Sequence, residues 1–252
     1  MFRLSIVLLT ILGLQVPAPL RSELAPSGRM RVGINFGNAL LATKDANGNQ
    51  GGIAVDLARE LARRTGIPMD IVGFDSAGVM ADGAKTAAWD VAFLATDPAR
   101  EGEIAFTAPY LEVDTTYLVP GDSRFRKVDD VDQKGVRISV SDKSAYDLFL
   151  TRNLKNAELV RIPGMNPSVD LFFAQKLDAV AGLKPLLVDV AEKHPGARVL
   201  DGRISVAQQA VGTLKGRNAA AKYLADFVAD IKSSGFLAAT IEKNKLRGVV
   251  VP

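Results

Sequence analysis

The stretch DVAFLATDPAREGEIAFTAPY, residues 90–110, contains the most informative pattern in the chain. Its first part, DVAFLA, is a nearly continuous apolar run, which is typical of a buried strand in a parallel sheet. An Asp-Pro-Ala-Arg turn follows at once and places Arg100 just beyond the end of that strand. An arginine there is either a solvated turn residue or a ligand for an anion, because a guanidinium offers two parallel N–H donors to a carboxylate.

Strand-like and helix-like segments alternate on both sides of this stretch. MRVGIN (30–35) and MDIVGFD (69–75) are strand candidates, and GGIAVDLARELARRTG (51–66) between them has apolar residues at helical spacing. A further helix is expected around residues 77–88. This β-α-β-α-β order predicts a parallel sheet that is covered by helices on both faces.

The same pattern starts again in the second half of the chain. VRISVS (136–141), AELVRIP (157–163) and DAVAGL (178–183) are strand candidates with helical segments between them. A polar segment, residues 121–135, separates this unit from the first one, so two α/β lobes are expected. The segment from residue 206 onward has too few strands for a third domain, and it is expected to return to the first lobe.

Composition excludes several kinds of site. The 252 residues are 48% hydrophobic and 23% charged, with a net charge of +3 and no long run of one sign, so no nucleic-acid-binding surface is indicated. The chain has no cysteine and a single histidine, His194, in a polar turn. Thiolate chemistry, disulfides, a Ser-His-Asp triad and multi-histidine metal sites are therefore not expected. We expect neither a cofactor nor a metal.

The N-terminus is typical of a secretory signal. Arg3 precedes an apolar run over residues 4–16, which is short for a membrane span but suits the apolar region of a signal peptide. Residues 1–22 are interpreted as this signal. Prolines flank Ala18, the small residue near its end, so the cleavage position stays open, and a short membrane anchor is the alternative. We expect an exported protein in the periplasm.

In this order of segments, and most specifically in residues 90–110, the chain resembles the extracellular solute-binding proteins of family 3. These are the periplasmic components of polar amino-acid ABC transporters. The stretches GVRISVSDKSAYD and LDAVAGL continue the resemblance through the second unit. It implies an α/β fold of the type II periplasmic binding proteins, in which two lobes with helix-flanked parallel-type sheets are joined by two crossover strands. The implied bounds are 28–111 plus 209–252 for lobe 1 and 118–203 for lobe 2, with crossovers near 110–119 and 203–212.

The resemblance also implies a ligand in the cleft between the lobes. In this family the arginine after the strand binds the carboxylate of the ligand, and here that position is Arg100. Ser144 and Asp147 form a capping box, which by itself predicts only an ordinary helix start. The resemblance implies that this helix N-terminus completes the binding of the carboxylate from lobe 2. The N–H groups near Ser144 and Ala145 would then face the carboxylate.

One position departs from the family pattern. Amino-acid binders carry an acidic residue after the LDA strand to pair with the ammonium group of the ligand, and here Leu183 occupies that place, followed by Lys184. An ammonium group without an acidic partner is poorly compensated in a closed cleft. A carboxylate that lacks the amine is therefore a serious candidate. The expected ligand-binding residues are Asn35, Asn38, Ala95, Thr96, Arg100, Ser144, Ala145 and Leu183.

The leading hypothesis is a monomeric, non-enzymatic binding protein that delivers a small carboxylate-bearing solute to a membrane permease. The alternative is an exported enzyme similar to cyclohexadienyl dehydratases, which share this scaffold. Such chemistry needs a positioned acid or base. Asp97 is a candidate, although an aspartate before a proline is more typical of a turn. A sensory ligand-binding domain is disfavoured because no membrane-spanning run follows the second unit.

Overall fold

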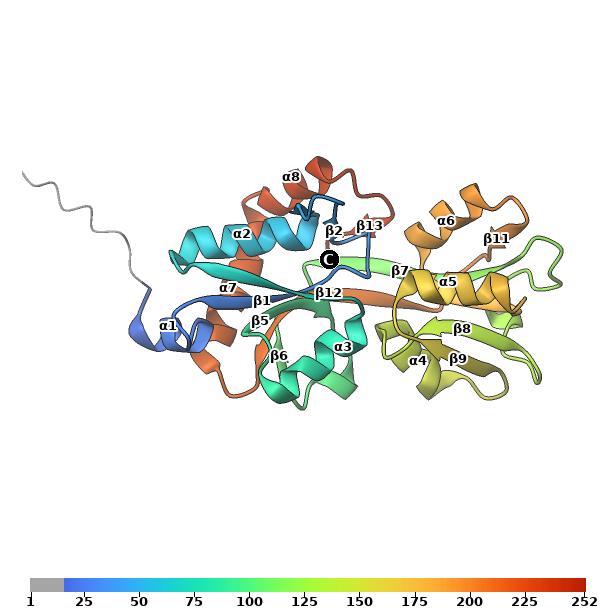
Figure 1. Cartoon of the computed structure of the whole chain (residues 1–252), viewed down its shortest axis with the longest axis horizontal. Helices are drawn as coiled ribbons and strands as arrows, with labels where there is room; N and C mark the ends of the chain where they lie inside the picture. Colours follow the sequence, from blue (N-terminus) through green and yellow to red (C-terminus); the bar gives the residue numbers. More distant parts are fainter. Residues whose placement is uncertain (1–15) are drawn as a thin grey trace, which may run out of the picture.

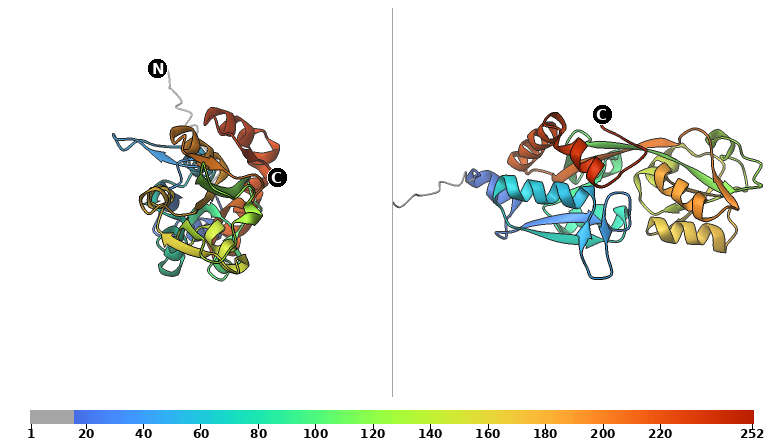
Figure 2. Two further views of the ribbon diagram at one scale, coloured as in Figure 1. Left: turned by 90° about the vertical axis from the view of Figure 1, so that its right-hand side faces the viewer. Right: turned by 90° about the horizontal axis from the view of Figure 1, so that it is seen from above.

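The computed structural model describes residues 16–252 and shows two lobes side by side (Figure 1). Two long strands, β7 (Leu111–Pro120) and β12 (Ser205–Leu214), run through both lobes (Figures 1 and 2). They pair antiparallel from Ser205–Thr115 to Gln209–Leu111. One sheet therefore continues through the whole molecule in the order β4-β1-β5-β12-β7-β10-β8-β9. The two-lobed α/β fold with two crossover strands is as predicted.

Lobe 1 is built on a parallel core of strands. β1 (Met30–Asn35) lies between β4 (Met69–Phe74) and β5 (Val91–Ala95) and pairs parallel with both. β5 then pairs antiparallel with the second half of β12, which brings the C-terminal segment back to this lobe. The helices of lobe 1 are α1 (Ala18–Leu24), α2 (Ile53–Thr65), α3 (Ala77–Asp82), α7 (Asn218–Ser233) and α8 (Phe236–Lys243).

The apolar run that begins at residue 91 is explained by burial on both faces of β5. Val91 and Phe93 pack into the main core, which also contains α2, whereas Ala92 and Leu94 pack into a second cluster with α3. Alternate residues of a strand point to opposite faces, so a strand that is covered on both sides needs apolar residues at every position.

Lobe 2 repeats the arrangement. β8 (Arg137–Ser141) pairs parallel with β9 (Glu158–Ile162) and with β10 (Ala179–Leu183), and β10 pairs antiparallel with β7. Its helices are α4 (Ala145–Asn153), α5 (Met165–Ala174) and α6 (Lys184–Lys193).

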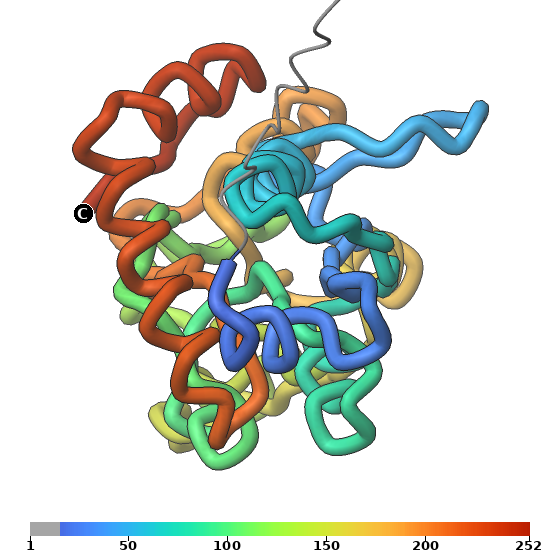
Figure 3. The backbone as a smooth tube through the Cα atoms, turned by 90° about the vertical axis from the view of Figure 1, so that its left-hand side faces the viewer, coloured from blue at the N-terminus to red at the C-terminus, as the bar shows by residue number. Residues whose placement is uncertain are grey.

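The remaining elements are short. β2 (Thr43–Lys44) and β3 (Gln50–Gly51) form a hairpin that projects from lobe 1 (Figure 3). The others are the 3₁₀ turns η1 (Gly83–Thr86), η2 (Pro98–Arg100) and η3 (Val128–Asp130), and the strands β6 (Ile104–Phe106), β11 (Ala197–Val199) and β13 (Val249–Val250).

Most of the predicted signal sequence lies outside the described residues. Its last part, however, is α1, in which Leu20 and Leu24 are buried. The Glu23 carbonyl oxygen accepts a hydrogen bond from Arg217 at 2.7 Å, and its carboxylate accepts one from the Ala220 N–H at 2.8 Å. A boundary at residue 22 would therefore cut a helix that belongs to the fold. Within residues 16–252 no helix is both long and apolar enough to cross a membrane.

Asp90 connects three elements of lobe 1 at the start of β5. Its buried carboxylate accepts hydrogen bonds from Arg31 (Nε 3.0 Å, Nη2 2.9 Å) and from Arg217 (2.9 Å). Its carbonyl oxygen accepts one from the Thr213 hydroxyl at 2.9 Å. Burial alone would raise the pKa of Asp90, but the hydrogen bonds from Arg31 and Arg217 outweigh it and hold the pKa below the ordinary value. The charged form of Asp90 therefore stabilises the fold.

We predict that Asp90→Asn lowers the free energy of unfolding by about 3 kcal/mol at neutral pH, because two arginines lose a buried counter-charge. The lowered pKa means that this stabilisation is complete above the ordinary aspartate pKa and is lost as the pH falls through the folded-state value. Urea unfolding at a series of pH values measures this. The difference in the free energy of unfolding between wild type and Asp90→Asn should become smaller as the pH is lowered.

The matched control is Asp70→Asn. Asp70 makes a similar two-pronged pair with Arg29, at 2.7 Å for each bond, but on the surface of the protein. Exposed pairs contribute little to stability, so this variant should unfold nearly as wild type does. Equal effects at the two positions would contradict the role given to Asp90.

Candidate functional site

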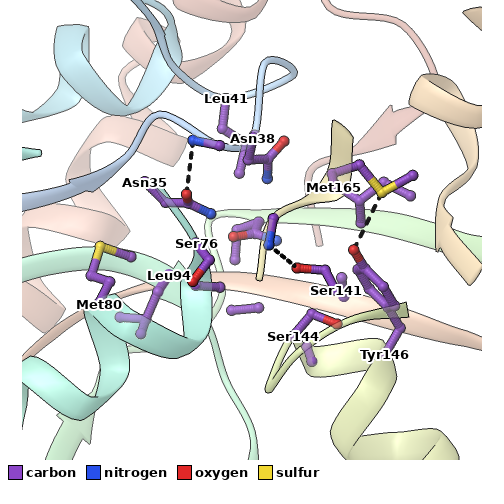
Figure 4. Close-up of a pocket in the computed structure, with 18 of the residues that line it drawn as sticks. Asn35, Asn38, Leu41, Ser76, Met80, Leu94, Ser141, Ser144, Tyr146 and Met165 are labelled. Carbon is purple, nitrogen blue, oxygen red and sulfur yellow. Dashed lines mark hydrogen bonds between the residues drawn. The ribbon is translucent and has the colours of Figure 1, made fainter. Parts of the chain in front are cut away.

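A pocket lies between the lobes, where several strands end. Its walls include Asn35 at the end of β1, Ala95 at the end of β5, Ser141 at the end of β8 and Leu183 at the end of β10. The N-terminal ends of α3, α4 and α5 complete it (Figure 4). Ligands of open α/β sheets bind beyond the carboxyl ends of the strands, so this pocket is the candidate functional site.

The structure brings six of the eight predicted site residues together in this pocket. The six are Asn35, Asn38, Ala95, Ser144, Ala145 and Leu183. Thr96 and Arg100 do not line it. The Thr96 N–H donates to the carbonyl oxygen of Gln208 at 2.8 Å and so continues the pairing of β5 with β12.

Arg100 lies behind the wall of the pocket instead of in it. Its guanidinium donates from Nη1 to the carbonyl oxygen of Ala95, and from Nη2 to the carbonyl oxygen of Lys143 at 2.8 Å. Asp97 caps η2 by accepting from the Ala99 N–H at 2.9 Å, and this turn directs the arginine back towards the end of β5. Arg100 therefore does not line this pocket but a neighbouring hollow, with Lys143 and Leu148 of lobe 2, and its direct contact with a ligand stays a prediction.

Arg100 remains a positive charge close to the site. Only 5% of the residue is exposed, and its Nε is buried without a hydrogen-bond partner among the described residues. Burial lowers the pKa of Arg100 to about 10, which still leaves the side chain protonated at neutral pH. Both of its carbonyl partners adjoin the pocket, since Ala95 lines it and Lys143 precedes Ser144.

The N-terminus of α4 lies at the pocket. Ser144 is the N-cap, and its hydroxyl oxygen accepts from the Asp147 N–H at 3.1 Å. The first N–H groups of a helix have no partner within the helix, and together with the helix dipole they favour an anion. Ser144, Ala145 and Tyr146 all line the pocket.

Three serines add further donors. The hydroxyl oxygens of Ser76 and Ser141 each accept one backbone N–H, from Val79 and Gly164 respectively, both at 3.2 Å, as Ser144 accepts that of Asp147. An acceptor bond leaves the hydrogen of a hydroxyl free to donate. In the same way, the Asn35 side-chain oxygen accepts from the Gly37 N–H at 3.0 Å, so its NH₂ group is left as a donor.

Most of the remaining lining is apolar, apart from Asn38 and Gln209, and all of it is neutral. Met80, Phe93 and Leu94 line the lobe 1 side, and Tyr146 and Met165 line the lobe 2 side, where the Tyr146 hydroxyl donates to the Met165 sulfur at 3.4 Å (Figure 4). Burial raises the pKa of Tyr146 to about 12. Tyr146 is therefore uncharged at neutral pH.

No acidic or basic side chain lines this pocket among the described residues, and Leu183 at the end of β10 gives it an apolar wall. Those residues also contain no cluster of histidine, cysteine, aspartate and glutamate that could hold a metal ion. The pocket can therefore hold a ligand through many hydrogen-bond donors and apolar contacts, without an acidic partner for an ammonium group.

Met165 lies over a glycine in β10. A Cβ atom on Gly182 would come within 2.4 Å of the Met165 methyl carbon and 2.9 Å of its sulfur. The absence of a side chain at Gly182 thus allows Met165 to occupy its place in the wall.

Sequence reasoning missed several lining residues, chiefly Ser76, Ser141, Tyr146, Met165 and Gln209. The rule that sites form beyond strand ends could have found Ser141, and a capping pattern could have found Ser76 as the first residue before α3. Gln209 lies within the apolar run of β12 and had no local signal.

Comparison with known proteins identifies the family. Residues 30–245 match the model of the bacterial extracellular solute-binding proteins, family 3. Among curated proteins, cyclohexadienyl dehydratase of Pseudomonas aeruginosa is 25% identical over 198 residues, which are 77% of this chain and 71% of that protein.

Solved structures have the same fold. A mutant of ArgBP from T. maritima has a TM-score of 0.78 at 23% identity, covering 90% of this chain and 100% of that chain. The solute receptor for L-cysteine of Neisseria gonorrhoeae has a TM-score of 0.79 at 21% identity, covering 89% and 93%. An ancestral amino acid-binding protein described as a precursor of cyclohexadienyl dehydratase has a TM-score of 0.75 at 20% identity, covering 88% and 97%. The family match spans most of the chain, and this protein belongs to the bacterial extracellular solute-binding proteins, family 3.

Proposed function

We propose that this protein is the exported solute-binding component of an ABC importer, and that it binds a small monocarboxylate between its lobes. The observation that carries the proposal is the lining of the pocket, which is rich in hydrogen-bond donors and has no acidic side chain among the described residues. Amino acid-binding structures share the fold and support binding as the function.

A carboxylate suits this set of donors. Its two oxygens are acceptors only, and they match the helix N-terminus at Ser144 and the free hydroxyl hydrogens of Ser76 and Ser141. The charge of Arg100, held behind Ala95, favours an anion over a neutral ligand.

An α-ammonium group has no acidic partner in the lining among the described residues. A carboxylate compensates such a cation best when it is removed from water, and the amide oxygens of Asn38 and Gln209 carry no charge. The wall at Leu183 is apolar, and that residue is 4% exposed. We therefore favour an acid without the amine over an α-amino acid.

Catalysis is the second candidate, because a curated relative is a cyclohexadienyl dehydratase. A dehydration of that kind needs a group that transfers a proton near neutral pH. Among the described residues that line the pocket none is an aspartate, glutamate, lysine, arginine or histidine, and Tyr146 has its pKa raised to about 12. The Asp97 side chain, the candidate acid, is paired with Arg152 outside the lining. We propose a binding protein and not an enzyme.

Contacts across the cleft support a mechanism of lobe closure. Asp97 of lobe 1 accepts two hydrogen bonds from Arg152 of lobe 2, at 2.9 and 2.8 Å. Gly78 approaches the opposite lobe so closely that a Cβ atom would lie 2.8 Å from the carbonyl oxygen of Asp142. The structure thus has its lobes in contact, which is the state that a permease recognises in our proposal.

Export and a permease partner complete the proposal. We propose that the signal ends before α1, because Leu20 and Leu24 of that helix are part of the core. The mature protein would then act in the periplasm, as the family description of extracellular binding proteins suggests.

Titration calorimetry with hydrocinnamate and phenylalanine tests the ligand class, since the two differ only in the amine. We expect hydrocinnamate to bind at least as tightly as phenylalanine, because the lining has no acid for the ammonium. Incubation with a cyclohexadienyl carboxylate should give no turnover. Clear preference for phenylalanine would overturn the ligand class, and turnover that scales with protein concentration would favour the enzyme.

Arg152→Gln is predicted to open the lobes. The variant loses both bonds to Asp97, so small-angle scattering without ligand should give a larger radius of gyration, and ligands should bind more weakly. Arg161→Gln is the matched control, because Arg161 pairs with the equally buried Asp147 at 3.0 Å inside lobe 2. The control should lose stability without opening. The same radius of gyration in Arg152→Gln and wild type would count against a closing role.

Arg100→Ala separates a charge effect from a structural one. If the Arg100 charge favours a carboxylate, the variant should weaken binding of hydrocinnamate by about 2–3 kcal/mol and binding of its primary amide much less. Calorimetry with the acid and the amide measures both. Equal losses for the two ligands would show that Arg100 acts only by linking Ala95 to Lys143.

A further inference from the structure

Gln209 lies at the point where β12 passes from one lobe to the other. It is paired with Leu111 of β7 and also with Ala95 of β5, so β12 changes partner at this residue. Its carbonyl oxygen accepts from the Tyr110 N–H at 2.8 Å. The backbone of Gln209 is therefore held firmly at the junction of the lobes.

The side chain of Gln209 faces the pocket without a partner. The residue is 4% exposed and lines the cavity, and no group among residues 16–252 donates to its amide or accepts from it. Neither amide atom is among the fully buried polar atoms that lack a partner, so the amide is open to the cavity. A molecule bound there displaces water from the amide and has to supply hydrogen bonds in its place. The neighbouring Gln208 differs, since it is exposed and donates to the Glu112 carboxylate at 2.9 Å.

Asn38 supplies a second open position in the same pocket. Its side-chain oxygen is buried and has no hydrogen-bond partner in the described chain. Its carbonyl oxygen accepts from the N–H groups of Leu41 and Ala42, both at 3.0 Å, which fixes the loop around it. The pocket therefore contains a preformed acceptor at Asn38 as well as the donor and acceptor of Gln209.

We infer that Gln209 and Asn38 recognise at least one hydroxyl group, so that the ligand is a small hydroxylated monocarboxylate. This rests on the proposed binding function and names the ligand more closely. A hydroxyl both donates and accepts, and it can therefore satisfy both an amide NH₂ and an amide oxygen.

Other substituents match these groups less well. A keto oxygen only accepts and leaves the Asn38 oxygen unpaired. An ammonium only donates and leaves the NH₂ of Gln209 unpaired, besides lacking an acid in the lining. An unsubstituted acid leaves both amides without a partner from the ligand.

Calorimetry with two carbon skeletons tests this inference. The leucine and phenylalanine skeletons are each used as the amino acid, the α-hydroxy acid, the α-keto acid and the unsubstituted acid. In the skeleton that binds, we expect the hydroxy acid to bind about tenfold or more tightly than the unsubstituted acid, because buried amides are left unpaired by the latter.

Gln209→Met and Gln208→Met are the matched variants. Methionine has a length similar to that of glutamine but lacks its amide, so Gln209→Met should lose most of the preference for the hydroxy acid, while Gln208→Met keeps it. Asn38→Ala, in a loop, should also reduce the preference for the hydroxy acid over the unsubstituted acid. It serves as an independent test if Gln209→Met proves less stable than wild type.

The outcomes separate the inference from the function on which it rests. Equal binding of hydroxy and unsubstituted acids by wild type, or an unchanged preference in both Gln209→Met and Asn38→Ala, overturns only the hydroxyl inference. Binding of none of the acids, or clear preference for the amino acids, overturns the proposed monocarboxylate and the inference together.

Discussion

The antiparallel pairing of β7 with β12 is the constraint on which the rest of the structure depends. The two strands are paired from Ser205–Thr115 to Gln209–Leu111, and beyond that point β12 joins the sheet of lobe 1 while β7 joins that of lobe 2. Because successive side chains point to opposite faces, a slip of one residue would exchange Gln208 and Gln209. The same backbone bonds thus unite the lobes and decide which amide faces the pocket.

Much of the fold was predictable because its signals are local. Helix α2 has buried residues at Ile53, Leu57 and Leu61, and it ends at Gly66, which adopts the left-handed conformation with φ +64° that glycine favours. Features without a local signal were missed. Helix α1 follows directly on the apolar run of the predicted signal, and only its packing against α7 shows that it belongs to the fold.

The candidate site was predicted less completely, for a physical reason. Residues at strand ends, such as Asn35 and Leu183, follow from chain topology and from the resemblance to the family. The direction of the Arg100 side chain depends on a capped 3₁₀ turn and on a carbonyl oxygen of the other lobe. The hydrophobic periodicity of the sequence gives no information on either. Gln209 and Met165 enter the pocket only through tertiary packing, so no pattern in their own segments indicated them.

The space above Gly182, which the Met165 side chain occupies, affects the width of the pocket more than its hydrogen-bonding groups. Gly182 is not among the residues that line the cavity, yet the space above it sets where the Met165 side chain lies. Any side chain at that position would have to move the flexible end of Met165 and with it the partner of the Tyr146 hydroxyl, while the serines and the two amides of the lining kept their places. Relatives that differ at this one backbone position could therefore accept solutes of another girth through the same polar contacts.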